Sequence, residues 1–301
     1  MDYNLITVLG PTAVGKTKLA AQIAYYYDGE IISADSRQVY KGMNLGTGKD
    51  YDDYIINKKK IPYHLIDLIS PAEEFNVFLF KEYFIKAVTE ITEREKIPVL
   101  CGGTGLYLSA LIQNYKLKHK NIISREELEK LTFDELKSLY LELNKSPHNT
   151  TDLLDRNRTM EALMILKSND KKYSDTSTLK SYTIGINPGR EEIKRRISHR
   201  LKGRLESGMI EEVKLLMDKG IDVERMISMG LEYKFIAYYL TGKLGYNDMF
   251  QQLNSAIIGF AKRQMTWFRK MENDGIMINW IESNDFLKAK VLIESAGFRS
   301  I

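Results

Sequence analysis

The 301 residues contain one cysteine, Cys101, so neither an internal disulfide nor a cysteine-based metal cluster can form. The 4 histidines lack the spacing of metal ligands, and we infer no zinc site. No apolar run approaches the roughly 18 residues that a transmembrane helix needs. The chain enters an apolar segment at once, without the basic region and cleavage site of a signal peptide. We therefore expect a cytoplasmic protein with no membrane partner.

The composition is typical of a soluble globular protein, with 44% hydrophobic and 28% charged residues. The net charge of +4 is mild, but basic residues gather in two segments. One carries Arg190, Lys194, Arg195, Arg196, Arg200, Lys202 and Arg204, and the other carries Lys262, Arg263, Arg269 and Lys270 beside Gln264 and Trp267. Such clusters suit a polyanion such as nucleic acid, although one cluster alone is also typical of a solvated helix face.

The N-terminal segment predicts a phosphate-binding loop. An apolar run precedes Gly10, Pro11, Thr12, Ala13, Val14, Gly15, Lys16 and Thr17, and a helical pattern follows. In the order strand, loop, helix, the spacing G-x-x-x-x-G-K-[ST] places backbone N–H groups and a helix N-terminus around an anion. Lys16 would reach the outer phosphate, and the Thr17 hydroxyl would hold Mg²⁺. We expect this loop to bind a di- or triphosphate.

Short apolar segments alternate with helical patterns over most of the chain. The expected strands are residues 5–9, 30–34, 61–67, 97–101, 182–186 and 276–281, and the main later helices are 77–96, 190–205, 249–269 and 286–295. This alternation predicts an α/β fold, with a P-loop-type, mostly parallel sheet flanked by helices. Helical patterns dominate residues 115–181, which predicts a helical insertion that closes over the site. The expected core is residues 1–114 and 182–301, with a helical C-terminal part.

Two further segments follow expected strands directly. Asp35 comes after residues 30–34, and a glycine loop with Thr104 comes after residues 97–101. Ligands in open α/β sheets bind outside the carboxyl ends of the strands, so Asp35 could face the ligand of the first loop. The second loop would bring Thr104 close to the first, unless it is only a tight strand-to-helix turn.

Six segments, in the same order along the chain, resemble the tRNA dimethylallyltransferase family, also called isopentenylpyrophosphate:tRNA transferases. They are residues 10–17, 35–40, 46–49, 63–67, 102–107 and 261–269, and together they span nearly the whole chain. The first segment is shared with many nucleotide-binding and ATP-binding enzymes. The segments at 35–40 and 261–269 are far more specific.

The resemblance implies transfer of a dimethylallyl group from dimethylallyl diphosphate to N6 of the adenosine 3′-adjacent to the anticodon in tRNA. The diphosphate would lie in the first loop, where Lys16 and a Mg²⁺ near Thr17 neutralise the charge that develops as the C–O bond breaks. Asp35 is similar in position to the family's general base for the attacking amine. A capping role or a contact with Mg²⁺-bound water is the alternative for Asp35.

The resemblance also implies contacts with a flipped adenosine and with the anticodon stem–loop of tRNA. The matching positions are Asp35, Ser36, Arg37 and Gln38 near the base, Thr104 in the second glycine loop, and Lys262, Arg263, Gln264, Trp267 and Arg269 near the C-terminus. Arg156 and Arg158 in the insertion are further candidate RNA contacts. Arg196 and Arg200 match basic positions of the family's long helix more weakly. Contacts with phosphates position RNA without reading its sequence. We expect a monomer.

The chain departs from the family pattern at two positions where arginine is usual. Ile257-Ile258 stand in place of Thr-Arg, and Ile227 or Ser228 stands where many members carry an arginine near the diphosphate. These losses favour a second hypothesis, an RNA-binding paralogue that is catalytically weak or idle. A third hypothesis, a kinase or prenyltransferase acting on free nucleotides, explains the first loop but not the basic segment near the C-terminus.

Overall fold

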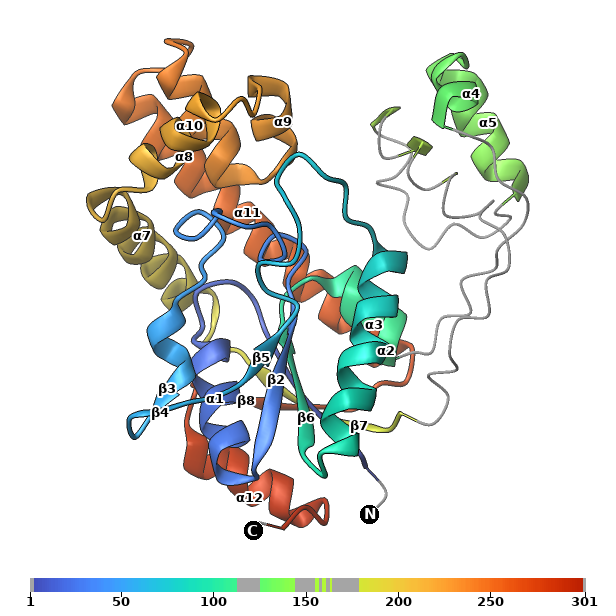
Figure 1. Ribbon diagram of the computed structural model, residues 1–301, viewed down its shortest axis with the longest axis vertical. Helices are drawn as coiled ribbons and strands as arrows, with labels where there is room; N and C mark the ends of the chain where they lie inside the picture. Colours follow the sequence, from blue (N-terminus) through green and yellow to red (C-terminus); the bar gives the residue numbers. More distant parts are fainter. Residues whose placement is uncertain are drawn as a thin grey trace. The chain divides into compact units, whose positions relative to one another are not determined.

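The computed structural model describes residues 3–112, 125–143, 155–156, 159–160, 163 and 179–299. The chain divides into two compact units, Met1–Asn114 with Thr176–Ile301, and Tyr115–Asp175. The first unit contains the sheet and the helices around it (Figure 1). That the second unit closes over the site stays a prediction.

The first unit is built on a six-stranded sheet in the order β5-β2-β6-β1-β7-β8. Its strands are β1 (Leu5–Leu9), β2 (Gly29–Ala34), β5 (Tyr63–His64), β6 (Ile97–Gly102), β7 (Ser181–Ile186) and β8 (Ile278–Ile281). Every pairing between neighbours is parallel, which confirms the predicted fold class. All the expected strands are present, although β5 and β8 are shorter than the apolar segments that predicted them.

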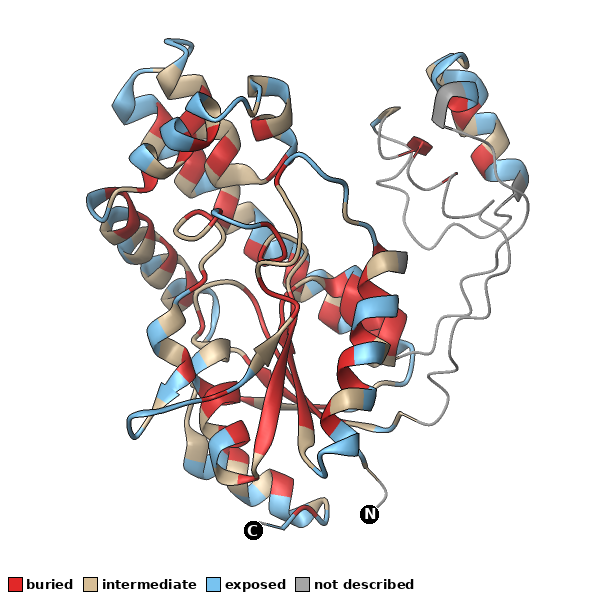
Figure 2. Ribbon diagram, viewed as in Figure 1, coloured by how far each residue is buried: buried red, intermediate tan, exposed pale blue. Residues whose placement is uncertain are grey.

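Helices cover both faces of the sheet, with α1 and α12 on one side and α2 and α3 on the other (Figure 1). The bounds in this unit are α1 (Lys16–Tyr26), the 3₁₀ helix η1 (Tyr51–Tyr54), α2 (Val77–Glu93), α3 (Gly105–Ile112), α7 (Arg190–Glu206), α8 (Met209–Asp218), α9 (Val223–Ser228), α10 (Leu231–Leu240), α11 (Tyr246–Asn273) and α12 (Phe286–Ser295). The central strands are buried along their length (Figure 2). Burial on both faces explains why they are apolar runs rather than alternating patterns.

The second unit contains α4 (Arg125–Glu129) and α5 (Phe133–Leu143). These helices share a small apolar cluster with two residues from further along the chain; its members are Leu128, Leu136, Tyr140, Met160 and Leu163. Much of the helical pattern expected over residues 115–181 lies outside the described residues. The unit therefore has its own core among the residues that the structure describes.

The sequence did not predict two local elements. A hairpin of β3 (Ile55–Ile56) and β4 (Lys59–Lys60) lies in the charged segment 50–60. Its turn residues Asn57 and Lys58 have φ values of 49° and 65°, as a two-residue hairpin turn of type I′ requires. Helix α9 was also missed, because a helix of 6 residues is too short to show a period.

The sheet brings the predicted site segments to one edge. In the order of the strands, β2, β6 and β1 are neighbours and all run in the same direction. Their carboxyl ends carry Asp35, the glycine loop before α3 and the loop before α1, respectively. Strand β7, on the other side of β1, leads at the same edge into the basic helix α7. The candidate site therefore lies at the carboxyl end of the sheet, as expected for this fold.

Candidate functional site

The loop between β1 and α1, which we call the donor loop (residues 10–17), has a backbone that is strongly curved. Gly10 has φ 153°, and a Cβ there would lie 2.7 Å from the carbonyl oxygen of Ile186, so only glycine fits. Ala13 also has a left-handed φ of 67°. Lys16 opens α1, and its Nζ donates a hydrogen bond of 2.7 Å to the carbonyl oxygen of Pro11, across the loop. The lysine is thus folded over the place where a phosphate would lie.

Thr12 is held from two sides by helices that come late in the chain. Its N–H donates to Oε1 of Gln264 on α11 at 2.8 Å. Its hydroxyl accepts a hydrogen bond from Nη2 of Arg200 on α7 at 2.5 Å. The donor loop is therefore fixed by contacts 252 and 188 residues away in sequence.

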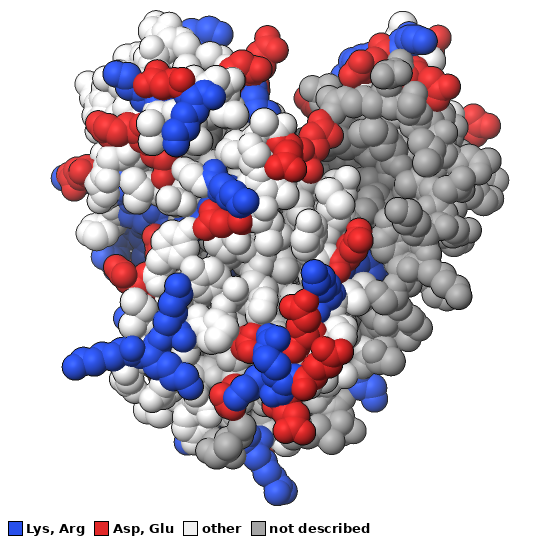
Figure 3. Space-filling model, in the orientation of Figure 1, with Lys and Arg blue, Asp and Glu red and all other residues white. Residues whose placement is uncertain are grey.

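A cavity of about 340 Å³ opens beside the donor loop. Its lining is basic apart from one loop residue, and consists of Ala13, Arg195, Arg196, His199 and Arg200. On the molecular surface, basic side chains gather in a recess at the left edge of Figure 3, where Figure 1 places α7. Arg195 and Arg196 both pair with Glu192, which fixes them on the helix surface. The concentration of positive charge beside a phosphate loop favours an anionic ligand.

The charged groups at the donor loop are perturbed by burial. Burial lowers the pKa of Lys16 to about 8, and Arg200 acts in the same direction, whereas Asp35 opposes the shift. Burial also lowers the pKa of Arg200 to about 10, so its guanidinium stays charged at neutral pH. Burial raises the pKa of Cys101, at the end of β6, to about 12. The thiol is therefore neutral and serves as a small buried side chain.

Asp35 lies at the end of β2 and begins a tight turn. Its Oδ1 accepts a hydrogen bond of 2.9 Å from the N–H of Arg37, so part of the predicted capping role is present. The N–H of Ser36 donates to Oγ1 of Thr104 at 3.3 Å, which joins this turn to the second glycine loop. The residues that the sequence placed at three strand ends therefore lie together.

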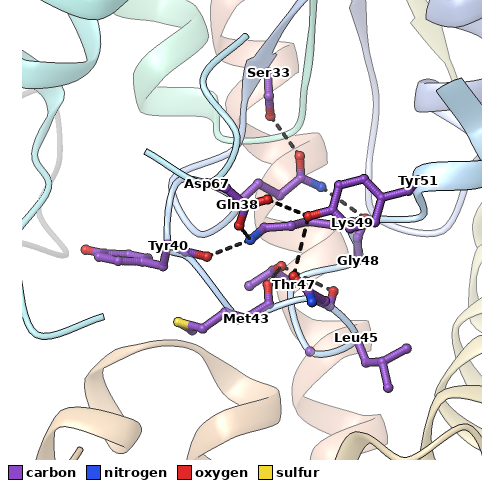
Figure 4. A network of polar contacts seen from close by, with 12 residues as sticks. Ser33, Gln38, Tyr40, Met43, Leu45, Thr47, Gly48, Lys49, Tyr51 and Asp67 are labelled. Atoms are coloured by element: carbon purple, nitrogen blue, oxygen red, sulfur yellow. Dashed lines mark hydrogen bonds and ion pairs between the residues drawn. The ribbon is translucent and has the colours of Figure 1, made fainter. Parts of the chain in front are cut away.

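A buried polar network holds the loop between Asp35 and Tyr51 (Figure 4). The amide of Gln38 accepts a hydrogen bond from the Ser33 hydroxyl at 2.8 Å and donates to the carbonyl oxygen of Gly48 at 3.0 Å. Lys49, buried, donates at 2.6 Å both to Asp67 and to the carbonyl oxygen of Tyr40. In this conformation the Gln38 amide is hydrogen-bonded to other residues of the protein. Its contact with a base of the RNA stays a prediction.

Glu212 on α8 anchors the tip of the same loop. Its carboxylate accepts hydrogen bonds from the backbone N–H groups of Asn44, Leu45 and Gly46 at 2.9, 2.7 and 3.1 Å. The hydroxyl of Tyr233 donates to the same carboxylate at 2.7 Å. A single side chain thus satisfies successive N–H groups that a free loop would leave to water.

The predicted RNA-binding segment near the C-terminus lies on α11 and is divided between the two sides of the helix. Lys262, Arg263 and Arg269 are exposed. Gln264 is buried, with 5% of its surface exposed, and its Nε2 donates to the carbonyl oxygen of Gly103 at 2.8 Å. Trp267 is half-buried and packs close to Gly105. The exposed side can contact a polyanion, whereas the buried side holds the core.

Two predicted contacts fall in the second unit. Nη2 of Arg156 donates to the carbonyl oxygens of Glu129 and Leu131, at 2.9 Å each, and so satisfies backbone groups at the end of α4. Arg158 lies outside the described residues. The role of either residue in RNA binding stays a prediction.

The sequence placed Arg200 with RNA and missed its position at the donor loop. The signal was available: Arg196, Arg200 and Arg204 are spaced by four residues on the helix that follows β7, so they share one side of it. That side continues to Arg204, whose guanidinium pairs with Asp50 at 2.9 Å.

The family is decided by comparison with known proteins. The model of the IPP transferase family matches residues 38–271. This chain belongs to the IPP transferase family. It is 47% identical over 291 residues to a tRNA dimethylallyltransferase 2 of Phocaeicola vulgatus, with 93% of both chains covered. It is 48% identical over 289 residues to a tRNA dimethylallyltransferase 2 of Pelobacter propionicus, with 93% of this chain and 90% of the relative covered.

Solved structures of the IPP transferase family have the same fold. The full-length tRNA isopentenylpyrophosphate transferase of Bacillus halodurans is 33% identical, with a TM-score of 0.71, and the match covers 98% of this chain and 96% of that one. A tRNA isopentenylpyrophosphate transferase of Staphylococcus epidermidis is 28% identical, with a TM-score of 0.68 and coverage of 97% and 98%. The predicted family and the predicted prenyltransferase class are therefore confirmed.

The described residues contain neither a cluster of metal ligands nor a helix suited to crossing a bilayer. Within them, no set of three or more His, Cys, Asp or Glu side chains is arranged to hold a metal ion. No helix in the same residues is both long enough and apolar enough to cross a bilayer.

Proposed function

We propose that this chain transfers a dimethylallyl group from dimethylallyl diphosphate to N6 of the adenosine 3′-adjacent to the anticodon in tRNA. The observation that carries the proposal is that Lys16, Arg200 and Asp35 lie together: Arg200 bonds to Thr12 of the donor loop, and the charges of Arg200 and Asp35 both act on Lys16. Two cations next to a phosphate loop suit a diphosphate, and a carboxylate beside them suits a nucleophile that must lose a proton. The names of the relatives in the IPP transferase family support the same reaction.

The donor loop would hold the diphosphate of the donor. Lys16 would exchange its contact with the Pro11 carbonyl for one with the outer phosphate, and Arg200 lies one hydrogen bond away at Thr12. Mg²⁺ prefers oxygen ligands, and Thr17 in the first turn of α1 would supply one, with diphosphate oxygens and water completing the set. When bound, the ion would neutralise charge on the leaving diphosphate.

The acceptor would be an adenosine extruded from the anticodon loop. The N6 nitrogen forms a bond to C1 of the dimethylallyl group as the C1–O bond breaks and diphosphate leaves. The proton of N6 passes to the carboxylate of Asp35, whose Oδ1 is oriented by the N–H of Arg37. Lys16 and Arg200 stabilise the charge that the departing diphosphate gains. The exposed cations Lys262, Arg263 and Arg269 would bind phosphates of the stem–loop.

The test is a transfer assay with labelled dimethylallyl diphosphate, Mg²⁺ and an anticodon stem–loop that carries the target adenosine. A matched RNA without that adenosine and free AMP serve as controls. We expect label only in the adenosine-bearing RNA. Intact RNA binding without any label would favour the idle paralogue, and label in AMP would favour a nucleotide prenyltransferase. A cytoplasmic location and a monomeric state are part of the same proposal.

A further inference from the structure

One buried residue of α11, Gln264, carries a polar side chain where an apolar one would suit core packing. Gln264 is 5% exposed and lies at the point where α11 crosses the two glycine-containing loops. Its Oε1 accepts the N–H of Thr12 in the donor loop at 2.8 Å, and its Nε2 donates to the carbonyl oxygen of Gly103 at 2.8 Å. We propose that Gln264 is a positioning residue, which sets the shape of the donor loop for the diphosphate rather than binding RNA. The inference rests on the proposed function.

The neighbouring packing shows that the distance between α11 and the second glycine loop is fixed. A Cβ at Gly103 would lie 2.4 Å from Nε2 of Gln264. A Cβ at Gly105 would lie 2.6 Å from Cβ of Trp267, one turn further along the helix. Because α11 packs directly against this loop, the hydrogen bond to Gly103 fixes the orientation of the Gln264 amide that binds Thr12. Through its two hydrogen bonds, the amide therefore fixes the position of Thr12 in the donor loop relative to Gly103 at the end of β6.

Thr12 is the donor-loop residue that the Gln264 amide orients. Its hydroxyl accepts from Arg200 and its N–H donates to Gln264, so both of its polar groups are oriented before a ligand arrives. Without Gln264 the Thr12 N–H, which is partly buried, and the Gly103 carbonyl, which is buried, would both lose their partner. The loop would then have to be ordered by the ligand itself, which weakens binding of the ligand.

The same helix offers a matched comparison between its two sides. Gln264 and Lys262 are two residues apart, with Gln264 buried and Lys262 exposed. The positioning role predicts that Gln264→Met, which keeps the length and removes both hydrogen bonds, weakens binding of the donor. The proposed function predicts that Lys262→Met weakens binding of RNA. The two substitutions should therefore affect different ligands.

The experiment measures two affinities on the full chain, without turnover: Mg²⁺ with inorganic pyrophosphate by calorimetry, and the anticodon stem–loop by fluorescence anisotropy. For Gln264→Met we expect a roughly tenfold weaker pyrophosphate affinity, as for the loss of a buried hydrogen bond, with RNA affinity within twofold of the parent. For Lys262→Met we expect the reverse. Gln264→Glu keeps an acceptor for Thr12, but it sets a second acceptor against the Gly103 carbonyl and a negative charge beside the anion site, so its pyrophosphate affinity should be no higher than that of Gln264→Met.

A weaker RNA affinity with unchanged pyrophosphate affinity in Gln264→Met would overturn the inference and make Gln264 an RNA contact. Equal loss of both affinities in all Gln264 variants would also overturn it, because that pattern indicates general loss of structure. Failure of the proposed function is a separate outcome: the parent protein would bind both ligands, and Gln264→Met would still separate them, but no dimethylallyl group would reach the RNA.

Discussion

Lys16 of the donor loop and Arg200, which contacts that loop from α7, differ in pKa. Arg200, with a pKa of about 10, is charged throughout the physiological range. Lys16, with a pKa of about 8, begins to lose its charge just above it. Burial is the main cause in both cases, because a charge without water around it is less stable. The pH dependence of donor binding should therefore come from Lys16.

The affinity for dimethylallyl diphosphate should fall as the pH rises through about 8. Below that pH the free protein already carries the Lys16 charge, so binding needs no proton from solution. Above it, binding must take up a proton, and the affinity decreases by up to about tenfold per pH unit. The free energy of unfolding changes with pH in the opposite direction. The pKa of Lys16 in the folded protein lies below the unfolded value of 10.5, so the unfolded chain binds more protons between pH 8 and 10.5. The contribution of Lys16 to stability therefore rises over that range.

Calorimetric titrations with the donor, in the absence of RNA, at pH 7 to 9.5 would measure this effect. Lys16→Arg is the matched control, because a guanidinium keeps its charge over the whole range. We expect weaker but pH-independent binding in that variant. A parent affinity that does not change between pH 7 and 9.5 would contradict the assignment.

Asp35 has two candidate roles, and one substitution separates them. Asp35→Asn keeps an acceptor for the Arg37 N–H but cannot accept the proton of N6. If Asp35 is the base, kcat for transfer should fall by about 10²- to 10⁴-fold in both Asp35→Asn and Asp35→Ala. RNA affinity should stay within a few-fold of the parent. Near-normal turnover in Asp35→Asn would mean that the residue only caps its turn.

At the level of residues, the sequence predicted positions better than contacts. Asp35, Thr104 and the donor loop lie at one edge of the sheet, as expected, because parallel strands place their carboxyl ends together. The resemblance to the family assigns Gln38 and Gln264 to contacts with RNA. The structure uses both amides in hydrogen bonds between loops, and such partners, up to 252 residues apart, cannot be read from local pattern.

At the level of elements, the helices and strands with a clear pattern in their own residues were predicted, and those without one were missed. Helix α12 was placed at residues 286–295, where the structure has it, since its cap and its apolar spacing are both local. The hairpin β3–β4 was missed because Asn57 and Lys58 supply positive φ without a glycine to mark the turn. Short elements of this kind depend on contacts outside themselves.

The loop that follows β2 depends on one such contact, at Glu212. Its carboxylate binds the N–H groups of residues 44, 45 and 46 and the hydroxyl of Tyr233. Glu212→Gln turns one acceptor oxygen into an NH₂ group that faces other donors. We expect the free energy of unfolding to fall by about 1–3 kcal/mol.

Urea denaturation, followed by circular dichroism, would measure this loss. The neighbouring exposed Glu211→Gln removes the same charge and should change the free energy of unfolding by less than about 0.5 kcal/mol. Equal effects of the two substitutions would show that charge, and not the loop contact, is responsible.

At the level of the whole molecule, the absent family arginines do not leave the donor loop without a guanidinium. Ile258 packs against the core, and Ile257 lines a small cavity together with Arg200. Arg200, from α7, bonds to the loop itself. The second hypothesis, an idle paralogue, rested on those absent residues, and the position of Arg200 weakens its main argument.

The whole molecule carries a net charge of only +4, so its attraction for RNA must come from local clusters rather than from overall charge. Each cation that neutralises a phosphate releases counterions, and the logarithm of the RNA affinity then falls linearly with the logarithm of the salt concentration. If Lys262 and Arg263 on α11 each contact a phosphate, then Lys262→Met and Arg263→Met should each reduce that slope by about 0.7–0.9. Lys288→Met, an equal loss of charge at an exposed position of α12, is the control.

Anisotropy titrations with the anticodon stem–loop between 50 and about 300 mM salt give the slopes of the three variants and of the parent. We expect Lys288→Met to keep the parent slope, because an isolated charge on α12 adds to the net charge but neutralises no phosphate. If all three variants shift the slope equally, the attraction depends on net charge, and α11 is not the RNA-binding surface. If only the two α11 variants shift it, the exposed side of α11 binds the phosphates while its buried side, through Gln264, holds the donor loop.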